Sequence, residues 1–473
     1  MLVLRKFRAI GSTLSSFRSV ASLGKVHLNL QEPIAPVPGK YPVWSSHPSE
    51  LFADLKDDAI VFIQGASASP TLLTNALYEY VMEKKLKNIR VYQHLPLGDL
   101  AYLRDDARGH FKLSTSYSSK NCRDAVNDGR ADFIPIQMSE LPLLYRNKHV
   151  EIEYALVMLS PPDKHGFCTL GSAIGSARSA IQNAKRIIGQ INPLAPVTYG
   201  DSTVHISRLD FLFHGHQPLS EMLIPSANET EQKIAAIIAD NLVDDGATIQ
   251  LGFGRIPYEV TYRLRSHKDL GVHAEIIADG IIDLVNLGVI TNRLKPVQRG
   301  RIVTSYCIGT QRVFDFVNEN PQVSLNDIAW VNSTEIIAQN PKVTTVNTCF
   351  EMDLTGQSVA DGIGETIYTG VGGQLDFTRA ASVSEDGQGR PIITMCSKNS
   401  SGESSIVPVL RQGSAVVATR AHVHYVVTEY GIAYLFGKSL RQRAHALIQI
   451  AHPDFRESLE RAAFETLKTM PSP

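Results

Sequence analysis

The stretch "DDAIVFIQGASASPTLLTNAL", residues 57–77, decides the fold. It begins with an acidic turn, continues as a short β-rich apolar run, and passes through small residues to Pro70. Proline is favoured in the first turn of a helix, and the residues that follow have amphipathic spacing. The stretch therefore predicts a strand, a loop and a helix, after which "NIRVYQHL" (88–95) predicts a second strand.

A related stretch occurs in the second half of the sequence. "DDGATIQLGFGRIPYEVTYRL" (244–264) aligns with the first without a gap, and the aspartate pair, one glycine, the proline and the last leucine coincide. "GVHAEII" (271–277) then predicts the following strand. A strand, helix and strand in this order form a βαβ unit, whose strands are parallel. The repeat predicts an α/β protein with two related α/β halves and largely parallel sheets.

The boundary between these domains is predicted in "HQPLSEMLIPSANETE" (216–231), which is rich in Pro, Ser and Asn before a new helix. The N-terminal domain would span 29–225 and the C-terminal domain 226–473. Residues 1–28 are basic and rich in serine and contain no acid. This composition predicts a mitochondrial transit peptide and a location in the mitochondrial matrix; a disordered or helical arm is the alternative.

Composition excludes several classes of protein. The chain has 473 residues, 43% of them hydrophobic, and a formal net charge of −1, which argues against nucleic-acid or membrane-surface partners. Its five scattered cysteines predict a reducing compartment and neither a disulfide framework nor a metal site. No apolar run approaches the ~20 residues that span a bilayer, so a soluble protein is expected.

A single acid in the second predicted βαβ unit suggests where chemistry takes place. Parallel α/β sheets bind ligands at the carboxyl ends of their strands. "QLGFG" (250–254) ends one predicted strand, and Glu275 lies on the next, where an ionised carboxylate is costly to bury. If these strands are neighbours, the loop and the acid share one edge of the sheet. The first repeat has His94 in the corresponding strand and no acid.

Two glycine loops and a lysine accompany this acid. "GFGRIP" (252–257) lets a ligand approach the backbone before a helix N-terminus, although a tight turn explains it equally well. "YTGVGGQLDF" (368–377) can direct N–H groups at an oxyanion, or can be a turn between strands. Lys398 lies in a small polar loop, where it is solvated or anchors an anion. P-loop, nucleophile-elbow and dinucleotide fingerprints are absent, which disfavours NTPases and α/β-hydrolases.

One reaction uses these groups together. A desolvated glutamate can attack an acyl thioester and give an acyl-glutamyl anhydride and a thiolate. The thiolate then forms a glutamyl thioester and releases the acid, which a second acid can replace. Glycine N–H donors would stabilise each oxyanion, and losing one donor typically costs ~3 kcal/mol.

At this point the sequence resembles the acetyl-CoA hydrolase/transferase family of CoA-transferases. The resemblance rests on seven segments, namely "GRADFIPIQMSELP", "SPPDKHGFCTLG", "LGFGRIP", "HAEIIADGIIDLVNLGVIT", "MDLTGQ", "GVGGQLDF" and "EYGIAYLFGKSLRQRAHALIQIAHPDFRESL". It implies two tandem open α/β domains with a CoA-transferase fold of the NagB/RpiA-like type, and ping-pong transfer through a glutamyl-CoA thioester. It also implies coenzyme A as a substrate, no metal, no permanently bound cofactor, and a homodimer.

The resemblance also assigns roles to residues. It places the nucleophile at Glu275 and an oxyanion and CoA contact at Gly373. It implies seven further CoA-binding residues, namely Gln250, Leu251, Gly252, Phe253, Gly254, Thr369 and Lys398. It leaves open whether Asn332 or Asn347 orients the glutamate.

The expected activity is transfer of CoA between short-chain carboxylates, with acetyl-CoA as donor and succinate or another short acid as acceptor. The alternatives are a 4-hydroxybutyrate or butyrate CoA-transferase, an acetyl-CoA hydrolase, and a catalytically silent CoA-binding scaffold.

Three further features each have two interpretations. His273 should share a strand face with the glutamate, and either tunes its pKa or satisfies a partner in the core. Asp163 and His165 form an acid/base pair or a rigid turn. Residues 437–455 either contact a partner subunit or CoA through their arginines, or form a helix that covers the sheet.

Overall fold

The computed structural model describes residues 35–45, 47–468 and 470–473. Residues 37–473 form one compact unit. The predicted transit peptide, residues 1–28, lies outside the described residues. No helix within the described ranges is long and apolar enough to cross a membrane.

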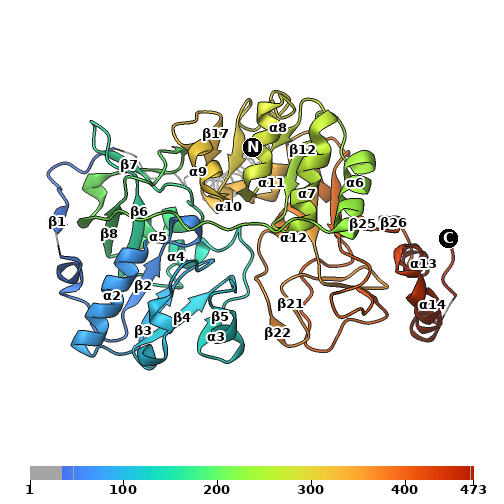
Figure 1. The fold of residues 1–473 in the computed structure, drawn as a ribbon, viewed down its shortest axis with the longest axis horizontal. Coiled ribbons are helices and arrows are strands. Elements are labelled where there is room, and N and C mark those ends of the chain that lie inside the picture. Colours follow the sequence, from blue (N-terminus) through green and yellow to red (C-terminus); the bar gives the residue numbers. More distant parts are fainter. Residues whose placement is uncertain (1–34, 46, 469) are drawn as a thin grey trace, which may run out of the picture. The chain divides into compact units, whose positions relative to one another are not determined.

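The first half, defined here as residues 37–225, is built on one eight-stranded sheet with the order β1-β11-β8-β6-β2-β3-β4-β5 (Figure 1). Every neighbouring pair in it is parallel. All six residues of β6 are buried, as expected for a central strand covered on both faces. The strands are β1 (Val43–Ser45), β2 (Ile60–Ile63), β3 (Ile89–Tyr92), β4 (Phe111–Thr115), β5 (Ala131–Phe133), β6 (Tyr154–Leu159), β8 (Arg186–Ile191) and β11 (Phe211–His214).

The second half, residues 226–473, is built on a six-stranded sheet with the order β13-β12-β18-β23-β25-β26. Only its last pair is antiparallel. The prediction of tandem α/β halves with largely parallel sheets is therefore confirmed. The strands are β12 (Thr248–Leu251), β13 (Gly271–Val272), β18 (Thr344–Thr348), β23 (Arg390–Thr394), β25 (Tyr425–Thr428) and β26 (Gly431–Tyr434).

Helices surround these sheets, and α6 and α7 lie side by side against the second one (Figure 1). The helices are α2 (Thr71–Lys84), α3 (Arg123–Asn127), α4 (Leu143–Arg146), α5 (Ala177–Asn183), α6 (Glu229–Leu242), α7 (Arg255–Arg263), α8 (Asp279–Asn286), α9 (Gln311–Val317), α10 (Ile328–Val331), α11 (Thr334–Ala338), α12 (Gln374–Ser382), α13 (Leu440–Ile450) and α14 (Pro453–Leu467). Smaller sheets contain β7 (Phe167–Thr169), β9 (Tyr199–Gly200), β10 (Thr203–His205), β14 (Ile276–Ile277), β15 (Ile302–Thr304), β16 (Tyr306–Cys307), β17 (Val323–Leu325), β19 (Glu351–Asp353), β20 (Ser358–Val359), β21 (Gly362–Ile363), β22 (Thr366–Ile367) and β24 (Ile406–Val407).

Both predicted βαβ units are present. β2 and β3 are parallel neighbours joined through α2, and β12 and β13 are parallel neighbours joined through α7. Pro70 is the N-cap residue of α2, as expected. Pro257 does not open its helix, because α7 already begins at Arg255. The N-cap residue Gly254 has a φ of 149°, a conformation open to glycine, and this allows the chain to enter the helix earlier.

The prediction of one continuous strand over 271–277 is wrong. β13 ends at Val272, the chain bends at Glu275, and β14 pairs with β16 rather than with the six-stranded sheet. The bend is fixed because the Glu275 carbonyl accepts hydrogen bonds from the backbone N–H groups of Ser305 (3.1 Å) and Tyr306 (3.0 Å). Glu275 therefore sits at a break between two short strands.

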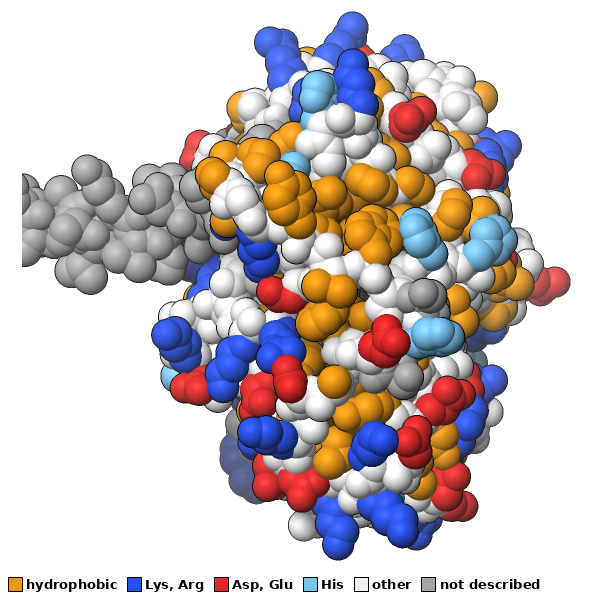
Figure 2. Space-filling view, turned by 90° about the vertical axis from the view of Figure 1, so that its left-hand side faces the viewer, with side chains coloured by type: hydrophobic (Ala, Val, Ile, Leu, Met, Phe, Trp, Pro, Cys, Tyr) orange, Lys and Arg blue, Asp and Glu red, His pale blue; other side chains and the backbone are white. Residues whose placement is uncertain are grey.

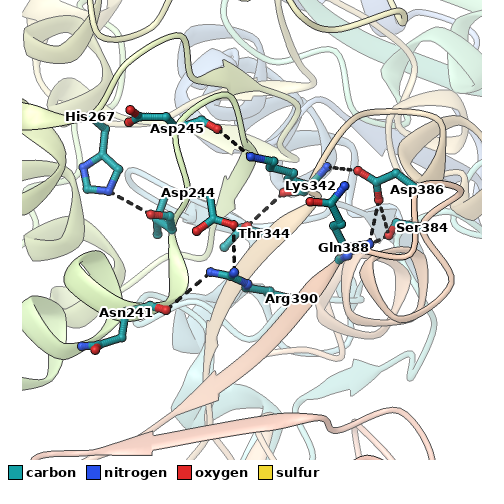
Figure 3. A network of polar contacts seen from close by, with 12 residues as sticks. Asn241, Asp244, Asp245, His267, Lys342, Thr344, Ser384, Asp386, Gln388 and Arg390 are labelled. Carbon is teal, nitrogen blue, oxygen red and sulfur yellow. Dashed lines mark hydrogen bonds and ion pairs between the residues drawn. The ribbon is translucent and has the colours of Figure 1, made fainter.

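A polar network ties together the amino ends of three strands of the second-half sheet (Figure 3). Arg390, the first residue of β23, pairs with Asp244 at 2.8 Å. Lys342, just before β18, donates through Nζ to the Asp245 carbonyl (3.1 Å) and through its backbone N–H to Asp386 (2.7 Å). Because these strands are parallel, their amino ends all lie on the same side of the sheet, where this network connects them. Their carboxyl ends lie on the opposite side, where parallel α/β sheets bind ligands.

The face shown in Figure 2 carries many apolar side chains and several histidines. It lies at the end of the first-half sheet where β1 is the edge strand (Figure 1). Tyr41, Val43 and Trp44 are exposed there, and the Trp44 ring stacks on His214 with a centroid distance of 4.5 Å. An edge strand with exposed apolar residues is a surface that can pair with another chain.

Candidate active site

The carboxylate of Glu275 lies where the bend between β13 and β14 meets α10 and α12. Its Oε2 accepts a hydrogen bond of 2.8 Å from Nδ2 of Asn332, the residue that follows α10. Gly373, the N-cap residue of α12, packs directly against it, because a Cβ built on Gly373 would overlap both Glu275 Oε2 and Asn332 Nδ2. The structure thus brings together the predicted nucleophile and the last glycine of the predicted oxyanion loop.

The structure distinguishes the two asparagines. Asn332 contacts Glu275, whereas Asn347 exchanges two hydrogen bonds of 3.1 and 3.0 Å with the side chain of Gln250. The Asn332 amide nitrogen must face Glu275, because it also donates to Oδ2 of Asp376 at 3.2 Å. A flipped amide would direct its oxygen at two carboxylates. Asn332 is therefore the residue that orients the glutamate.

The electrostatic environment of Glu275 favours its protonated form. The pKa of Glu275 is raised to about 7, chiefly by desolvation and to a smaller extent by the charge of Asp376, while the hydrogen bond from Asn332 lowers it. Burial likewise raises the pKa of Asp376 to about 6. A carboxylate that is stripped of water and still ionises near neutral pH is suited to nucleophilic attack.

His273 supports the structure of the site and does not take part in its chemistry. Its Nε2 donates to the Val331 carbonyl (2.8 Å), next to Asn332, and its Nδ1 faces the Asn340 amide at 3.3 Å. The ring also stacks on Trp330. Burial lowers the pKa of His273 to about 3, so the imidazole is neutral. Of its two interpretations, the structure supports a satisfied core residue.

The predicted CoA-binding residues Gln250 to Gly254 form the carboxyl end of β12 and the loop that follows it. The Gly252 N–H donates to the Val346 carbonyl at 2.8 Å, and a Cβ on Gly252 would lie 2.8 Å from Oδ1 of Asn347. The loop therefore needs a glycine to lie this close to β18. Leu251, Gly252 and Phe253 also line a mainly apolar pocket with about 460 Å³ of empty space. The pocket reaches Ala274 and Ile276, the two neighbours of Glu275.

The loop from Thr369 to Gly373 lies against the first half. The Ser118 N–H donates to the Thr369 carbonyl (2.9 Å), and the Met138 N–H donates to the Gly372 carbonyl (3.2 Å). A Cβ on Gly370 would overlap the Ser116 carbonyl, so the two backbones are in close contact. The active site is therefore assembled from both halves of the chain.

Aromatic rings from both halves surround the glutamate. His94, just beyond β3 in the first repeat, packs against the rings of Tyr117 and Tyr306, each at 5.8 Å. Burial lowers the pKa of His94 to about 3. Burial, and next the charge of Glu275, raises the pKa of Tyr117 to about 12 and that of Tyr306 well above its usual range. These rings are therefore uncharged at neutral pH.

The remaining candidates have other partners. Lys398 pairs with Asp454 at 2.7 Å, and its role in CoA binding stays a prediction. The Asp163 side chain accepts backbone N–H groups from His165 and Phe167, which supports the rigid-turn interpretation. On α13, Ala444, Leu447 and Ile448 are buried, which supports a covering helix. Among the described residues, no three His, Cys, Asp or Glu side chains are placed to hold a metal ion.

Two similarities to known proteins cover most of the chain. Residues 39–238 match the acetyl-CoA hydrolase/transferase N-terminal domain, and residues 309–463 match the acetyl-CoA hydrolase/transferase C-terminal domain. A succinyl-CoA:acetate/propanoyl-CoA:succinate CoA transferase from Fasciola hepatica is 55% identical over 94% of this chain and 92% of its own length. A 4-hydroxybutyrate coenzyme A transferase from Clostridium kluyveri is 39% identical over 86% of this chain and 94% of its own length.

A solved structure shares the fold. RipA from Yersinia pestis superposes with a TM-score of 0.84 and 31% sequence identity, over 90% of this chain and 98% of its own.

Proposed function

Because the chain belongs to the acetyl-CoA hydrolase/transferase family and is an enzyme that transfers CoA between carboxylates, we propose that the transfer proceeds through a covalent thioester at Glu275. The observation that carries the proposal is the contact of this half-buried carboxylate with Asn332 and with Gly373 in the glycine loop. The donor is the CoA thioester of a short-chain acid, and the acceptor is a short-chain carboxylate. Acetate and succinate are favoured, since both occur in the name of the relative that is 55% identical.

The proposed cycle begins when the Glu275 carboxylate attacks the thioester carbonyl of an acyl-CoA. The C–S bond breaks, CoA leaves as a thiolate, and an acyl-glutamyl anhydride forms. The thiolate then attacks the glutamyl carbonyl and releases the first carboxylate, which leaves a glutamyl-CoA thioester. A second carboxylate reverses these steps, takes the CoA, and regenerates Glu275. Neighbouring N–H donors, including that of Gly373, would stabilise each tetrahedral oxyanion.

The proposal is tested by incubating the enzyme with acetyl-CoA and no acceptor acid, followed by borohydride trapping and peptide mass spectrometry. A CoA adduct, or its reduced product, on the peptide that contains Glu275 is expected. Succinate should discharge the adduct as succinyl-CoA. Steady release of acetate without an adduct would instead identify a hydrolase, and neither adduct nor acetate with any short-chain acyl-CoA would identify a silent CoA-binding scaffold.

Activity is expected to depend on pH through Glu275. Only the carboxylate form attacks the thioester, and burial raises the pKa of Glu275 to about 7. The value of kcat/KM should therefore fall about tenfold per pH unit below about pH 7, and should be flat just above it. Initial rates with acetyl-CoA and succinate across this range measure the profile. Full activity two units below the expected pKa would contradict it.

Neither a metal nor a bound redox cofactor takes part in the proposed cycle, and CoA is a substrate. Activity should therefore survive dialysis against EDTA.

The boundary between the two domains is proposed near residue 225. A homodimer is also proposed, supported by the exposed apolar edge at Tyr41, Val43 and Trp44. Light scattering after size-exclusion chromatography would determine the mass.

A mitochondrial location is proposed from the basic, serine-rich composition of residues 1–28. This segment fused to a fluorescent reporter should direct it to mitochondria, whereas a diffuse cytosolic signal would overturn the proposal.

A further inference from the structure

Asp376 is a buried acid that the proposed cycle does not use. It lies in the first turn of α12 and is 4% exposed. Its Oδ2 accepts a hydrogen bond from Nδ2 of Asn332 (3.2 Å), the same nitrogen that donates to Glu275 (2.8 Å). One amide group therefore bridges two carboxylates, and each of its two N–H bonds is directed at a different one.

The other contacts of Asp376 come from the first half. The Ser139 hydroxyl donates to Oδ1 at 2.7 Å, and the Ser139 N–H donates to Oδ2 at 3.2 Å. A chain of hydrogen bonds thus runs from Ser139 through Asp376 and Asn332 to Glu275. It joins residues that are far apart in the sequence and belong to both halves.

The segment that carries Asn332 is held by the first half at its other end as well. Asp327, the N-cap residue of α10, forms an ion pair of 2.6 Å with Arg146 on α4. Asp327 is nearly inaccessible, with 5% of its side chain exposed, and Arg146 has 13% exposed. Asn332 therefore depends on first-half contacts both before α10 and through Asp376.

We propose that Asp376 is a positioning residue for CoA transfer, which together with Ser139 holds the Asn332 amide in the orientation that donates to Glu275. The proposal rests on Glu275 being the nucleophile. It links docking of the first half to the geometry of the reacting carboxylate, because Ser139 contributes two of the three hydrogen bonds to Asp376.

Because Asp376 is charged, replacing it should change the pKa of Glu275. A purely structural role would not change this pKa. Around Glu275, Tyr117 and Tyr306 are neutral phenols, and His94 and His273 are neutral imidazoles, because burial shifts each pKa away from the charged form. Glu140 is a further acid near Asp376, and its charge raises the pKa of Asp376. Asp376 is thus the charged group whose removal should lower the pKa of Glu275.

Three variants separate the contributions. In Asp376→Asn the carboxamide oxygen can replace Oδ2, and its NH₂ can donate to the Ser139 hydroxyl, so the orientation of Asn332 is kept while the charge is lost. Asp376→Ala removes both acceptors. Ser139→Ala removes only the hydroxyl contact from the first half. Asp353→Asn is the control, since the side chain of this buried acid accepts its hydrogen bonds from Thr355 and Gln357.

We expect Asp376→Ala to lower kcat about 10- to 100-fold with little change in KM for acetyl-CoA. Asp376→Asn should recover most of kcat and move the acid limb of kcat/KM to lower pH. Ser139→Ala should lower kcat by a smaller factor, and the control should not move the acid limb.

Two results would overturn the proposal. One is an Asp376→Ala enzyme with wild-type kcat, and the other is an unmoved acid limb in Asp376→Asn. If Asp376→Ala fails to fold, the proposal is tested by whether the acid limb of kcat/KM moves in Asp376→Asn. Trapping the glutamyl-CoA adduct in the wild-type enzyme is run in parallel. Its absence would refute the proposed function itself, whereas its presence with an unmoved acid limb would refute only the role of Asp376.

Discussion

Replacement of Glu275 by glutamine is expected to abolish CoA transfer and at the same time to make the protein more stable. The amide can still accept the hydrogen bond from Asn332 but cannot attack a thioester, so kcat should fall on the order of 10⁴-fold or more. The adduct on the Glu275 peptide should disappear as well. Coupled assay of succinyl-CoA formation and mass spectrometry measure both effects.

The stability effect follows from the pKa of the Glu275 carboxyl, which is raised to about 7 from an ordinary value of 4.5. Between these two values the folded protein binds a proton that the unfolded chain does not, so the wild-type enzyme loses stability as the pH rises through this window. The glutamine variant does not titrate there. Its advantage in the midpoint of thermal unfolding should therefore grow from about pH 5 to about pH 8 and then remain constant.

Glu457→Gln is the matched control, because the side chain of Glu457 is 89% exposed on α14 and pairs with Arg461 on the same helix. It should change neither activity nor stability. Retained CoA transfer in Glu275→Gln would refute the nucleophile assignment, and an unchanged unfolding midpoint at high pH would refute the raised pKa.

Replacement of Gly373 by alanine is expected to produce the second largest loss. The added methyl group would overlap Glu275 Oε2 and Asn332 Nδ2, so both must move away from the positions that the reaction uses. Displacement of a reacting group by about 1 Å can cost on the order of 100-fold in rate, and kcat should fall by at least this factor. Steady-state kinetics with acetyl-CoA and succinate measure the loss.

Gly387→Ala is the control for an added methyl group, since nothing lies within 4 Å of a Cβ at this position. Its φ of 67° makes alanine strained there, whereas Gly373 has a φ of −97° that any residue adopts. The control should therefore lose stability and keep its activity, whereas Gly373→Ala should lose far more activity than stability. An active Gly373→Ala enzyme would show that the close packing at Glu275 is not required.

The repeat was sufficient to predict the two βαβ units, because a strand, a loop and a helix are each determined by residues close together in the sequence. The carboxyl-edge rule then placed Glu275 and the glycine loop together correctly. The same reasoning missed the bend at Glu275, since donors that fix it come from Ser305 and Tyr306, about one strand and one helix further along.

The hydrogen-bond partners of the side chains were the part of the site that was hardest to predict from the sequence. Asn332 and Asn347 are equivalent in sequence terms, and only the packing of α10 and β18 separates a contact with Glu275 from a contact with Gln250. Asp376 lies within the segment "GVGGQLDF", yet nothing in the segment indicates that Ser139 faces it across 237 positions. Hydrophobic periodicity reports which face is buried and carries no information about such distant pairs.

Assembly of the active site from both halves has a consequence for how the enzyme matures. As the chain leaves the ribosome, the first-half sheet can complete itself before residues 332, 373 and 376 have been synthesised. Contacts between segments so far apart close last in folding, because their loop entropy must be overcome before they stabilise anything. In a refolding experiment the recovery of helical circular dichroism should therefore precede the recovery of enzymatic turnover, with a catalytically silent intermediate whose two sheets are formed but not yet docked.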